Sequence, residues 1–232
     1  MSTLLPQECA GLFPLGERER LGWDCLRVPV ALIIRALLRT YGGLQIEGAE
    51  HLPNEGSFVL VANHTSHLDA LCLLAALPLA RLPHAATVAA EDYFFQNRAR
   101  SWIAALTVNA LPFTRGKGAR ESLAACAEVL AQPGRMLLLF PEGTRSRDGR
   151  LHPFRSGIGA LVAGRGVPVL PCHIAGAHRS WPKGGRWPWP ARLRLRIGAA
   201  RRFGAEQERV AIAEELYAAV AELGQKNGID RA

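Results

Sequence analysis

Short apolar runs recur along the middle of this chain, and stretches with helical periodicity separate them. The apolar runs are candidates for buried strands, and they cover residues 58–62, 87–90, 136–140 and 167–174. The helical stretches carry Leu, Ala, Ile and Trp at helical spacing, and they cover residues 69–77, 98–108 and 120–131. This alternation predicts an α/β fold: a single domain with a mainly parallel or mixed sheet covered by helices.

The C-terminal third continues this pattern after a loop. Residues 178–190 are dense in Pro, Gly, Trp and basic side chains, which is typical of a loop. Residues 192–197 then alternate arginine with apolar side chains, so one face of a strand would be cationic and the other apolar. A helix is expected over residues 206–223, ended by Gly224.

Charge narrows the classes of partner. The chain has 232 residues, 49% of them hydrophobic, which is enough to bury the core of one domain. Its 28 Lys and Arg against 20 Asp and Glu give a formal net charge of +8. Such a balance favours acidic lipid, phosphate or nucleic acid as partners, and charge alone does not choose among them.

The cysteines and the N-terminus indicate the compartment. The five cysteines are scattered, odd in number and without a C-x-x-C pair, which fits a reducing cytosol. Residues 1–22 carry several charges and lack a long apolar core, so no secretory signal is expected. We therefore expect the protein on the cytosolic side.

An N-terminal amphipathic helix is expected over residues 28–38, because this apolar stretch is shorter than the roughly 20 residues that span a bilayer. Pro29 suits its first turn, and Gly42 and Gly43 suit its end. The expected apolar side consists of Val30, Ile33, Ile34, Leu37 and Leu38, with Arg35 and Arg39 opposite. Two interpretations stay open: a helix in the membrane interface, or a helix packed on the domain core.

The sharpest local motif is Asn-His-Thr-Ser-His-Leu-Asp at residues 63–69, between a predicted strand and a predicted helix. Active sites of α/β folds lie at such strand ends. In a continuous helix His64 and Asp69 would point about 140° apart, so they can meet only across a turn. Ser66 as N-cap would start the helix at His67 and direct Asp69 back toward the loop.

Several interpretations of this motif are possible. In the functional one, Asp69 orients the His64 ring, which takes a proton from a substrate hydroxyl as general base. In the structural one, Ser66 and Asp69 form a capping box and His64 is an ordinary loop histidine. A metal site made of His64, His67, Asp69 and Cys72 is a third, but no second ligand cluster supports it, so no metal is expected.

Two basic turns are candidate phosphate sites. Residues 111–118, Leu-Pro-Phe-Thr-Arg-Gly-Lys-Gly, offer backbone N–H groups and the Arg115 guanidinium before a helix. Residues 140–147 place Glu142 beside Arg145 on a Pro-Gly turn, where the carboxylate could hold an arginine that binds phosphate. Taken singly, each is also compatible with an ordinary surface turn.

Together these motifs resemble the phospholipid and glycerolipid acyltransferase family, which includes 1-acylglycerol-3-phosphate acyltransferases. The family's Asn-His, four residues, Asp motif is matched by Asn63, His64 and Asp69, and its Phe-Pro-Glu-Gly-Thr-Arg-Ser motif by residues 140–146. The Phe and Arg of a further motif are matched by Phe113 and Arg115. A proline-bounded strand at residues 167–171 completes the likeness, which covers about residues 44–198.

The resemblance implies an O-acyltransferase of phospholipid biosynthesis. Such an enzyme moves a fatty acyl group from acyl-CoA or acyl carrier protein to the free hydroxyl of a lysophospholipid, here first of all 1-acyl-glycerol-3-phosphate. Glycerol-3-phosphate and a non-phosphate lysolipid stay open as acceptors. Carried over by residue, the resemblance implies His64 as base, Asp69 as its partner, and a substrate-binding set of Arg115, Glu142, Gly143, Thr144 and Arg145, with no metal or cofactor.

The same resemblance suggests how the chain is divided. Residues 1–43 would be a membrane-surface segment, 44–204 the catalytic domain, and 205–232 a C-terminal helix. We expect peripheral attachment to an anionic membrane surface on its cytoplasmic face. An acyl-chain groove is expected from the helical stretches after Asp69 and around residues 102–111, although apolar residues there could equally be plain core.

Two rival functions remain. Trp181, Trp187 and Trp189 are interleaved with basic residues, which suits nucleic-acid binding, a lipid interface or a solvated basic face. The family resemblance favours lipid, so no nucleic acid is expected. A lipid-binding protein without catalysis is the other rival, and the intact His64 and Asp69 argue against it.

Overall fold

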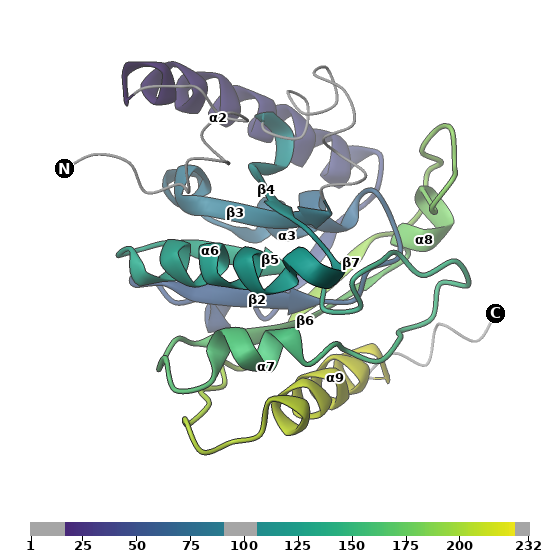
Figure 1. The fold of residues 1–232 in the computed structure, drawn as a ribbon. Helices are drawn as coiled ribbons and strands as arrows, with labels where there is room; N and C mark the ends of the chain where they lie inside the picture. The colour runs from purple at the N-terminus through teal and green to yellow at the C-terminus, as the bar shows by residue number, and fades with distance from the viewer. Residues whose placement is uncertain (1–16, 91–105, 226–232) are drawn as a thin grey trace.

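A seven-stranded sheet runs through the centre of the computed structural model, which describes residues 17–90 and 106–225 (Figure 1). The strand order is β1-β7-β6-β2-β5-β3-β4, and every neighbouring pair is parallel except β6 with β7. The strands are β1 (Gln45–Glu47), β2 (Phe58–Ala62), β3 (Ala85–Ala90), β4 (Ala110–Phe113), β5 (Met136–Leu139), β6 (Val169–Ala175) and β7 (Arg194–Ile197). The predicted mainly parallel α/β domain is confirmed.

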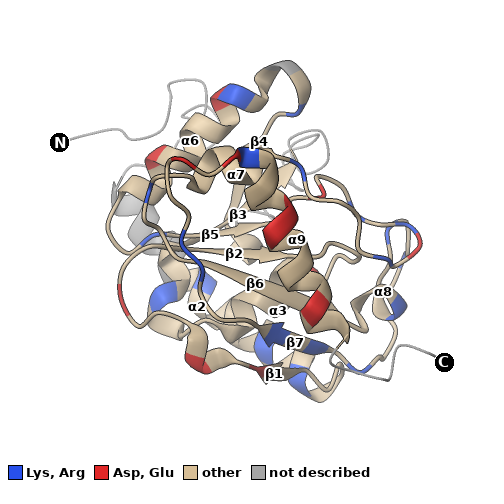
Figure 2. Ribbon diagram, turned by 90° about the horizontal axis from the view of Figure 1, so that it is seen from below, with Lys and Arg blue, Asp and Glu red and all other residues tan. Residues whose placement is uncertain are grey.

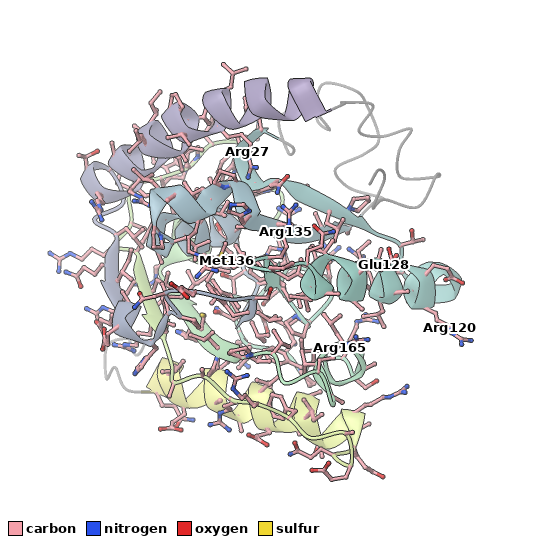
Figure 3. The ribbon with its side chains drawn as sticks, turned by 90° about the vertical axis from the view of Figure 1, so that its left-hand side faces the viewer. Arg27, Arg120, Glu128, Arg135, Met136 and Arg165 are labelled. Carbon is pink, nitrogen blue, oxygen red and sulfur yellow. The ribbon has the colours of Figure 1, made fainter. Side chains whose placement is uncertain are left out.

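Helices cover both faces of the sheet (Figures 1 and 3). Alternate residues of β2 point to opposite faces. Phe58, Leu60 and Ala62 join a core cluster under α2 (Glu17–Thr40) and α3 (Asp69–Ala76). The intervening valines join a second cluster under the helices of the other face, which are α6 (Ala119–Ala131), α7 (Gly157–Val162) and α9 (Arg209–Gln225). Both faces of the sheet are buried at β2, which explains why the sequence of this strand is apolar throughout.

The predicted strands are present with small shifts at their ends, and the sequence reasoning overlooked two short ones. Strand β1 has only three residues, too few to show a pattern. Strand β4 contains Pro112 and overlaps residues 111–118, whose composition predicts a turn, but it lies at the edge of the sheet, where a missing N–H is tolerated. Most of the helix predicted at 98–108 lies outside the described residues.

Helix α2 is longer than predicted, and the prediction that Pro29 lies in its first turn is wrong. The helix begins at Glu17 and carries Pro29 in its interior. The polar sequence of residues 17–25 has no apolar stripe that could have indicated this extension. None of the helices in the described residues combines the length and the apolar character that crossing a membrane requires.

The predicted faces of α2 are also wrong in part. Leu38 packs into the core, and Arg35 faces the same way and donates to the carbonyls of Leu77 at 2.5 Å and Leu74 at 3.5 Å, at the end of α3. Ile33 and Leu37, predicted on the apolar side with Leu38, are 60% and 57% exposed. The helix therefore packs on the core with one side and presents an apolar second side to the outside.

At the C-terminal end, β7 confirms the predicted alternation. Leu195 and Ile197 are buried in the core, whereas Arg196 lies on the opposite side of the strand. The prediction that Gly224 ends the last helix is wrong, because α9 continues to Gln225. A Cβ at Gly224 would lie 2.8 Å from Nε2 of His173, so this glycine allows the helix to pack closely against β6.

Candidate active site

Two loops meet at the carboxyl end of the sheet because β2 and β5 are parallel neighbours. Residues 63–69 follow β2, and residues 140–147 follow β5. The Ser146 N–H donates to the carbonyl of His64 at 2.8 Å, and the His64 N–H donates to Oε1 of Glu142 at 2.7 Å. The two motifs that the sequence singled out therefore form one site.

The His64 and Asp69 side chains meet as predicted. His64 Nδ1 lies 2.8 Å from Oδ2 of Asp69, and the same oxygen accepts the N–H groups of Thr65 at 2.6 Å and Ser66 at 2.7 Å. Asp69 is fully buried. Because Nδ1–H donates to the carboxylate, the basic lone pair of the ring is on Nε2.

The turn that brings them together differs from the predicted one. Helix α3 begins at Asp69, not at His67, and its N-cap is Leu68, which makes no side-chain cap. Ser66 Oγ accepts the Leu68 N–H at 3.1 Å and donates to the carbonyl of Trp181 at 2.7 Å. The Ser66 N–H donates to Asp69 as in a capping box, but the same carboxylate oxygen also binds His64, so the motif does more than cap a helix.

The imidazole of His64 has one apolar wall. It stacks on the Phe140 ring with the centroids 4.1 Å apart and an angle of 17° between the planes. The His64 side chain is 22% exposed, so one edge of the ring is open to a substrate. Asn63 anchors the loop, because its side chain donates to the carbonyl of Ile174 on β6 and accepts that residue's N–H.

Glu142 takes a different role from the one predicted. We expected its carboxylate to hold an arginine, but it is buried and accepts the backbone N–H groups of His64 and His152. Burial raises the pKa of Glu142 to about 7, although the bonds from these two N–H groups act in the opposite direction. Glu142 therefore positions the backbone of the catalytic candidate.

The next two residues shape the turn. Gly143 has a φ of 75°, and a Cβ there would lie 2.6 Å from Nε of Arg155, so both the turn and the guanidinium packed on it require glycine. Thr144 is exposed and accepts a hydrogen bond from Nζ of Lys183 at 3.2 Å.

Arg145 lies against His67, a residue that the sequence reasoning considered only as a metal ligand. Its Nη1 is 2.7 Å from Nδ1 of His67. Burial and the nearby positive charge of Arg145 lower the pKa of His67 to about 4, so this ring is neutral near pH 7. The His67 ring also contacts the Trp181 ring, with centroids 4.9 Å apart. Its place inside the first motif was the only sequence signal for this role.

A metal site has little support. Among the residues that the structure describes, no cluster of three or more His, Cys, Asp or Glu is arranged to hold a metal ion. Asp69 is already bound to His64, and burial raises the pKa of Cys72, which keeps its thiol protonated and a poor ligand.

Arg115 lies on the same edge of the sheet but further along. It is exposed and precedes the short η3 (Gly116–Gly118), after β4. Strand β4 is three positions from β2 in the sheet, which corresponds to about 14 Å between their ends at the usual strand spacing. The structure therefore brings His64, Asp69, Glu142 and Arg145 together, whereas the closeness of Arg115 to His64 stays a prediction.

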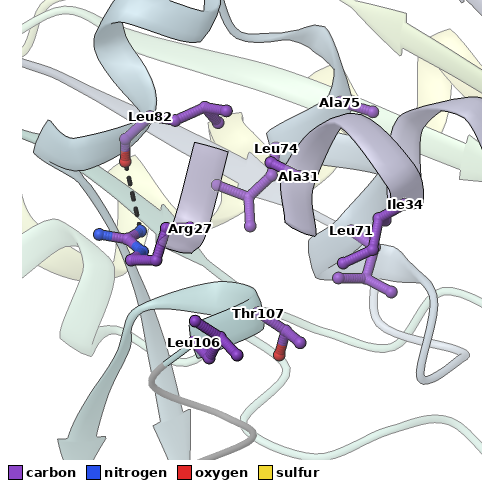
Figure 4. Close-up of a pocket in the computed structure, with 9 residues that line it drawn as sticks. All are labelled: Arg27, Ala31, Ile34, Leu71, Leu74, Ala75, Leu82, Leu106 and Thr107. Carbon is purple, nitrogen blue, oxygen red and sulfur yellow. Dashed lines mark hydrogen bonds between the residues drawn. The ribbon is translucent and has the colours of Figure 1, made fainter. Parts of the chain in front are cut away.

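An apolar pocket lies on the α3 side of the sheet (Figure 4). The two segments that were expected to form an acyl groove both contribute to it. Its lining consists of Arg27, Ala31 and Ile34 from α2, Leu71, Leu74 and Ala75 from α3, and Leu82, Leu106 and Thr107. The Arg27 guanidinium closes one side by donating to the carbonyl of Leu82 at 3.3 Å.

Comparison with known proteins agrees with this geometry. A family model described as Acyltransferase matches residues 43–175. The 1-acyl-sn-glycerol-3-phosphate acyltransferase of Limnanthes douglasii is 28% identical over 141 residues, which are 61% of this chain and 48% of that protein. The chloroplastic enzyme BAT2 of Brassica napus, with the same description, is 33% identical over 60% of this chain and 39% of that protein. The chain thus matches half or less of these relatives' length.

A solved structure is also similar. The crystal structure of the 1-acyl-sn-glycerophosphate acyltransferase PlsC from Thermotoga maritima superposes with a TM-score of 0.65 at 26% sequence identity. The match covers 90% of this chain and 82% of that one. The similarity therefore extends over the whole sheet and its helices, beyond the motifs themselves.

Proposed function

Because this chain belongs to the acyltransferase family, we propose that it moves a fatty acyl group from acyl-CoA or acyl carrier protein to the free hydroxyl of a lysophospholipid. The acceptor that its similarity to 1-acyl-sn-glycerol-3-phosphate acyltransferases favours is 1-acyl-glycerol-3-phosphate. The observation that carries the proposal is the hydrogen bond between His64 and the buried Asp69 at the end of β2.

The reaction that this pair supports is direct transfer. Nε2 of His64 takes the proton of the acceptor hydroxyl as its oxygen attacks the thioester carbonyl, and Asp69 stabilises the imidazolium that forms. The tetrahedral intermediate collapses with cleavage of the C–S bond. The His64 imidazolium then protonates the departing thiolate. All protons and electrons of the reaction are thus accounted for without a metal or a cofactor.

In this proposal the acceptor phosphate is bound by arginine. Arg145 lies beside the His64 loop, held against a neutral His67. We expect Arg115, which follows β4 on the same edge of the sheet, to bind the phosphate with it. Glu142, Gly143 and Thr144 form the turn that carries Arg145. The apolar pocket between α2 and α3 lies where the acyl groove is expected (Figure 4), but its volume of about 20 Å³ is room for about one water molecule, so these helices would have to move apart to admit a chain.

We also propose peripheral attachment to an anionic membrane on its cytoplasmic face. The exposed apolar side of α2 supports this, because such a helix can lie in the membrane interface. The formal net charge of +8 adds attraction to acidic headgroups.

The test is an acyl-transfer assay on a panel of acceptors with both kinds of donor. We expect transfer to 1-acyl-glycerol-3-phosphate above glycerol-3-phosphate and above lysolipids without a phosphate. The variant His64→Ala should lower kcat by about 10² to 10⁴, which is the usual contribution of a general base.

Matched controls separate loss of chemistry from loss of fold. The variant His152→Ala removes a half-exposed imidazole ring. His152 binds Glu142 through its backbone N–H, which the variant keeps, so the kcat of the variant should stay near that of the wild type. Circular dichroism should show both variants folded. The proposed function would be contradicted if folded His64→Ala kept wild-type turnover, or if the wild type transferred an acyl group to none of the acceptors.

A further inference from the structure

The loop of residues 181–190, which we call the tryptophan loop, exposes two indole rings on a backbone that hydrogen bonds hold at both ends. Trp187 and Trp189 are 74% and 70% exposed. The Trp189 N–H donates to the carbonyl of Ser180 at 2.8 Å, and Ser180 Oγ donates to the carbonyl of Trp189 at 2.6 Å. Trp181 Nε1 donates to the carbonyl of Gly185 at 2.9 Å. The exposure is therefore a property of the fold.

The tryptophan loop lies beside the exposed side of α2. Tyr41, directly after α2, donates a hydrogen bond from its hydroxyl to the carbonyl of Pro188 at 3.4 Å. Tyr41 is 52% exposed, and Leu37 and Ile33 continue the apolar surface along the helix. In Figure 1 the loop after α8 (Ala177–Ser180) rises from the body of the molecule on the side where α2 lies. Aromatic and aliphatic side chains thus share one surface.

The two chain segments that form this surface are rich in positive charge. The sequence contains no Asp or Glu between Asp148 and Glu206, and none between Asp24 and Glu47. The tryptophan loop and the part of α2 that follows Asp24 fall within these two intervals. Figure 2 shows Lys and Arg around α8. The arginines of β7 are not part of this surface charge, because both pair with Glu47 at the edge of the sheet. Exposed tryptophan within a cationic rim is the composition of a membrane-interface anchor on acidic lipid.

Lipid fits this surface better than nucleic acid does. A surface that binds single strands offers aromatic rings to successive bases along a basic groove. Here the tryptophan loop meets the end of α2 at Tyr41, and the exposed side of the helix continues with aliphatic Leu37 and Ile33, which have no ring for a base to stack on. Apolar burial in the acyl-headgroup boundary uses both kinds of side chain.

We infer that the tryptophan loop and the outer side of α2 form one docking surface for an anionic bilayer, and that this loop links membrane contact to the active site. The inference rests on the proposed acyltransferase function for its second half. The loop begins at Trp181, whose carbonyl accepts Ser66 Oγ at 2.7 Å and the His67 N–H at 3.2 Å. Lys183 binds Thr144 of the other site loop. Both loops of the site are thus bonded to the base of the docking element.

The binding test uses the full chain and vesicles of phosphatidylcholine with phosphatidylglycerol, separated by flotation. The double variant Trp187→Ser, Trp189→Ser should bind these vesicles about tenfold or more weakly, because two large apolar side chains no longer enter the interface. The variant Trp187→Phe, Trp189→Phe should restore most of the binding. The matched control Val210→Ser, which removes a 54% exposed apolar side chain on α9, should bind like the wild type.

A second readout tests the link to the active site. The ratio of kcat/KM for an acceptor in vesicles to that for a short-chain monomeric acceptor should fall about tenfold in the tryptophan double variant, and should not change in Val210→Ser. An equal fall in kcat/KM for both acceptors would overturn the link, because the loop would then stabilise the active site without a role in membrane contact.

The two proposals fail in different ways. Wild-type flotation by the folded tryptophan double variant would overturn the docking surface, whatever the enzyme activity. A nucleic-acid shift by the wild type without flotation would also overturn it. Flotation that depends on the tryptophans, in a protein that acylates no acceptor, would support the docking surface and remove the proposed enzymatic function.

Discussion

A single oxygen atom organises the candidate site at the scale of residues. Oδ2 of Asp69 accepts the ring of His64 and two backbone N–H groups of the loop between them. Oδ1 is buried and has no hydrogen-bond partner among the described residues. The loop is therefore bent around one carboxylate oxygen, which sets both the direction of the ring and its tautomer.

The role of Arg115 can be tested through the acceptor alone. The variant Arg115→Ala should raise KM for a phosphate-bearing acceptor roughly 10- to 100-fold, because a charge-assisted hydrogen bond to phosphate contributes about 1.5–3 kcal/mol. KM for the acyl donor should change little, since only one substrate loses the contact. Steady-state kinetics with each substrate varied in turn measures both.

Arg120 offers a control of the same charge. It is an exposed arginine near the start of α6 and points away from the sheet (Figure 3). Its variant Arg120→Ala should leave both constants near the wild-type values. Equal increases for acceptor and donor in Arg115→Ala would take Arg115 out of the acceptor site.

At the scale of elements, one arginine connects three of them. Arg196 of β7 is 7% exposed, pairs with Glu47 of β1 at 2.7 Å, and donates to the Leu223 carbonyl in α9 at 2.8 Å. These bonds fix the short edge strand and the last helix to the sheet. Arg201, by contrast, forms an exposed ion pair with Glu215.

The two arginines should differ in their effect on stability. Arg196→Ala removes a buried guanidinium and leaves the partly buried Leu223 carbonyl without this donor, so the free energy of unfolding should fall by about 1–3 kcal/mol. Arg201→Ala should lower it by less than about 1 kcal/mol, because exposed pairs contribute little. Urea unfolding of the two variants gives both values, and equal losses would contradict the structural role of Arg196.

At the scale of the whole molecule, the two functional surfaces are joined through the sheet. The active-site loops lie at the carboxyl end of β2 and β5, and the tryptophan loop lies over the first of them through Ser66 and His67. Helix α2 packs on α3, which begins at Asp69. A protein lying on a bilayer by α2 and the tryptophan loop therefore rests on elements that also hold the catalytic pair.

Global stability should depend on pH through Glu142. Because burial raises its folded-state pKa to about 7 from an ordinary 4.5, the folded protein binds its proton more tightly than the unfolded chain. This contribution to stability is fully present below pH 4.5 and is lost as the pH rises through 7. Glu142→Gln removes it, so the stability of the wild type relative to the variant should be greater at pH 5 than at pH 8.

Urea unfolding at both pH values measures this difference. Glu128→Gln, an exposed glutamate of α6 (Figure 3), reports the effect of removing one negative charge elsewhere. If wild type and Glu142→Gln differ by the same amount at pH 5 and pH 8, the assignment of a raised pKa to Glu142 is wrong.

Local chemistry was enough to predict the framework and the meeting of His64 with Asp69. A strand buried on both faces must be apolar throughout, so β2 and β5 could be located from the sequence almost to the residue. The meeting of His64 and Asp69 was equally predictable, because they are close in the chain and a short turn between them decides their geometry. Interactions between residues that are close along the chain can be predicted from the sequence itself.

Only the tertiary structure decided which distant groups share the site. Glu142 binds the His64 backbone, and Arg145 lies against His67, because β5 runs parallel to β2 in the sheet. The inward turn of Arg35 likewise depends on α3 ending where it can accept that guanidinium. A charged residue satisfies its hydrogen bonds with whatever the fold brings near it, and the periodicity of one segment carries no information about its neighbours.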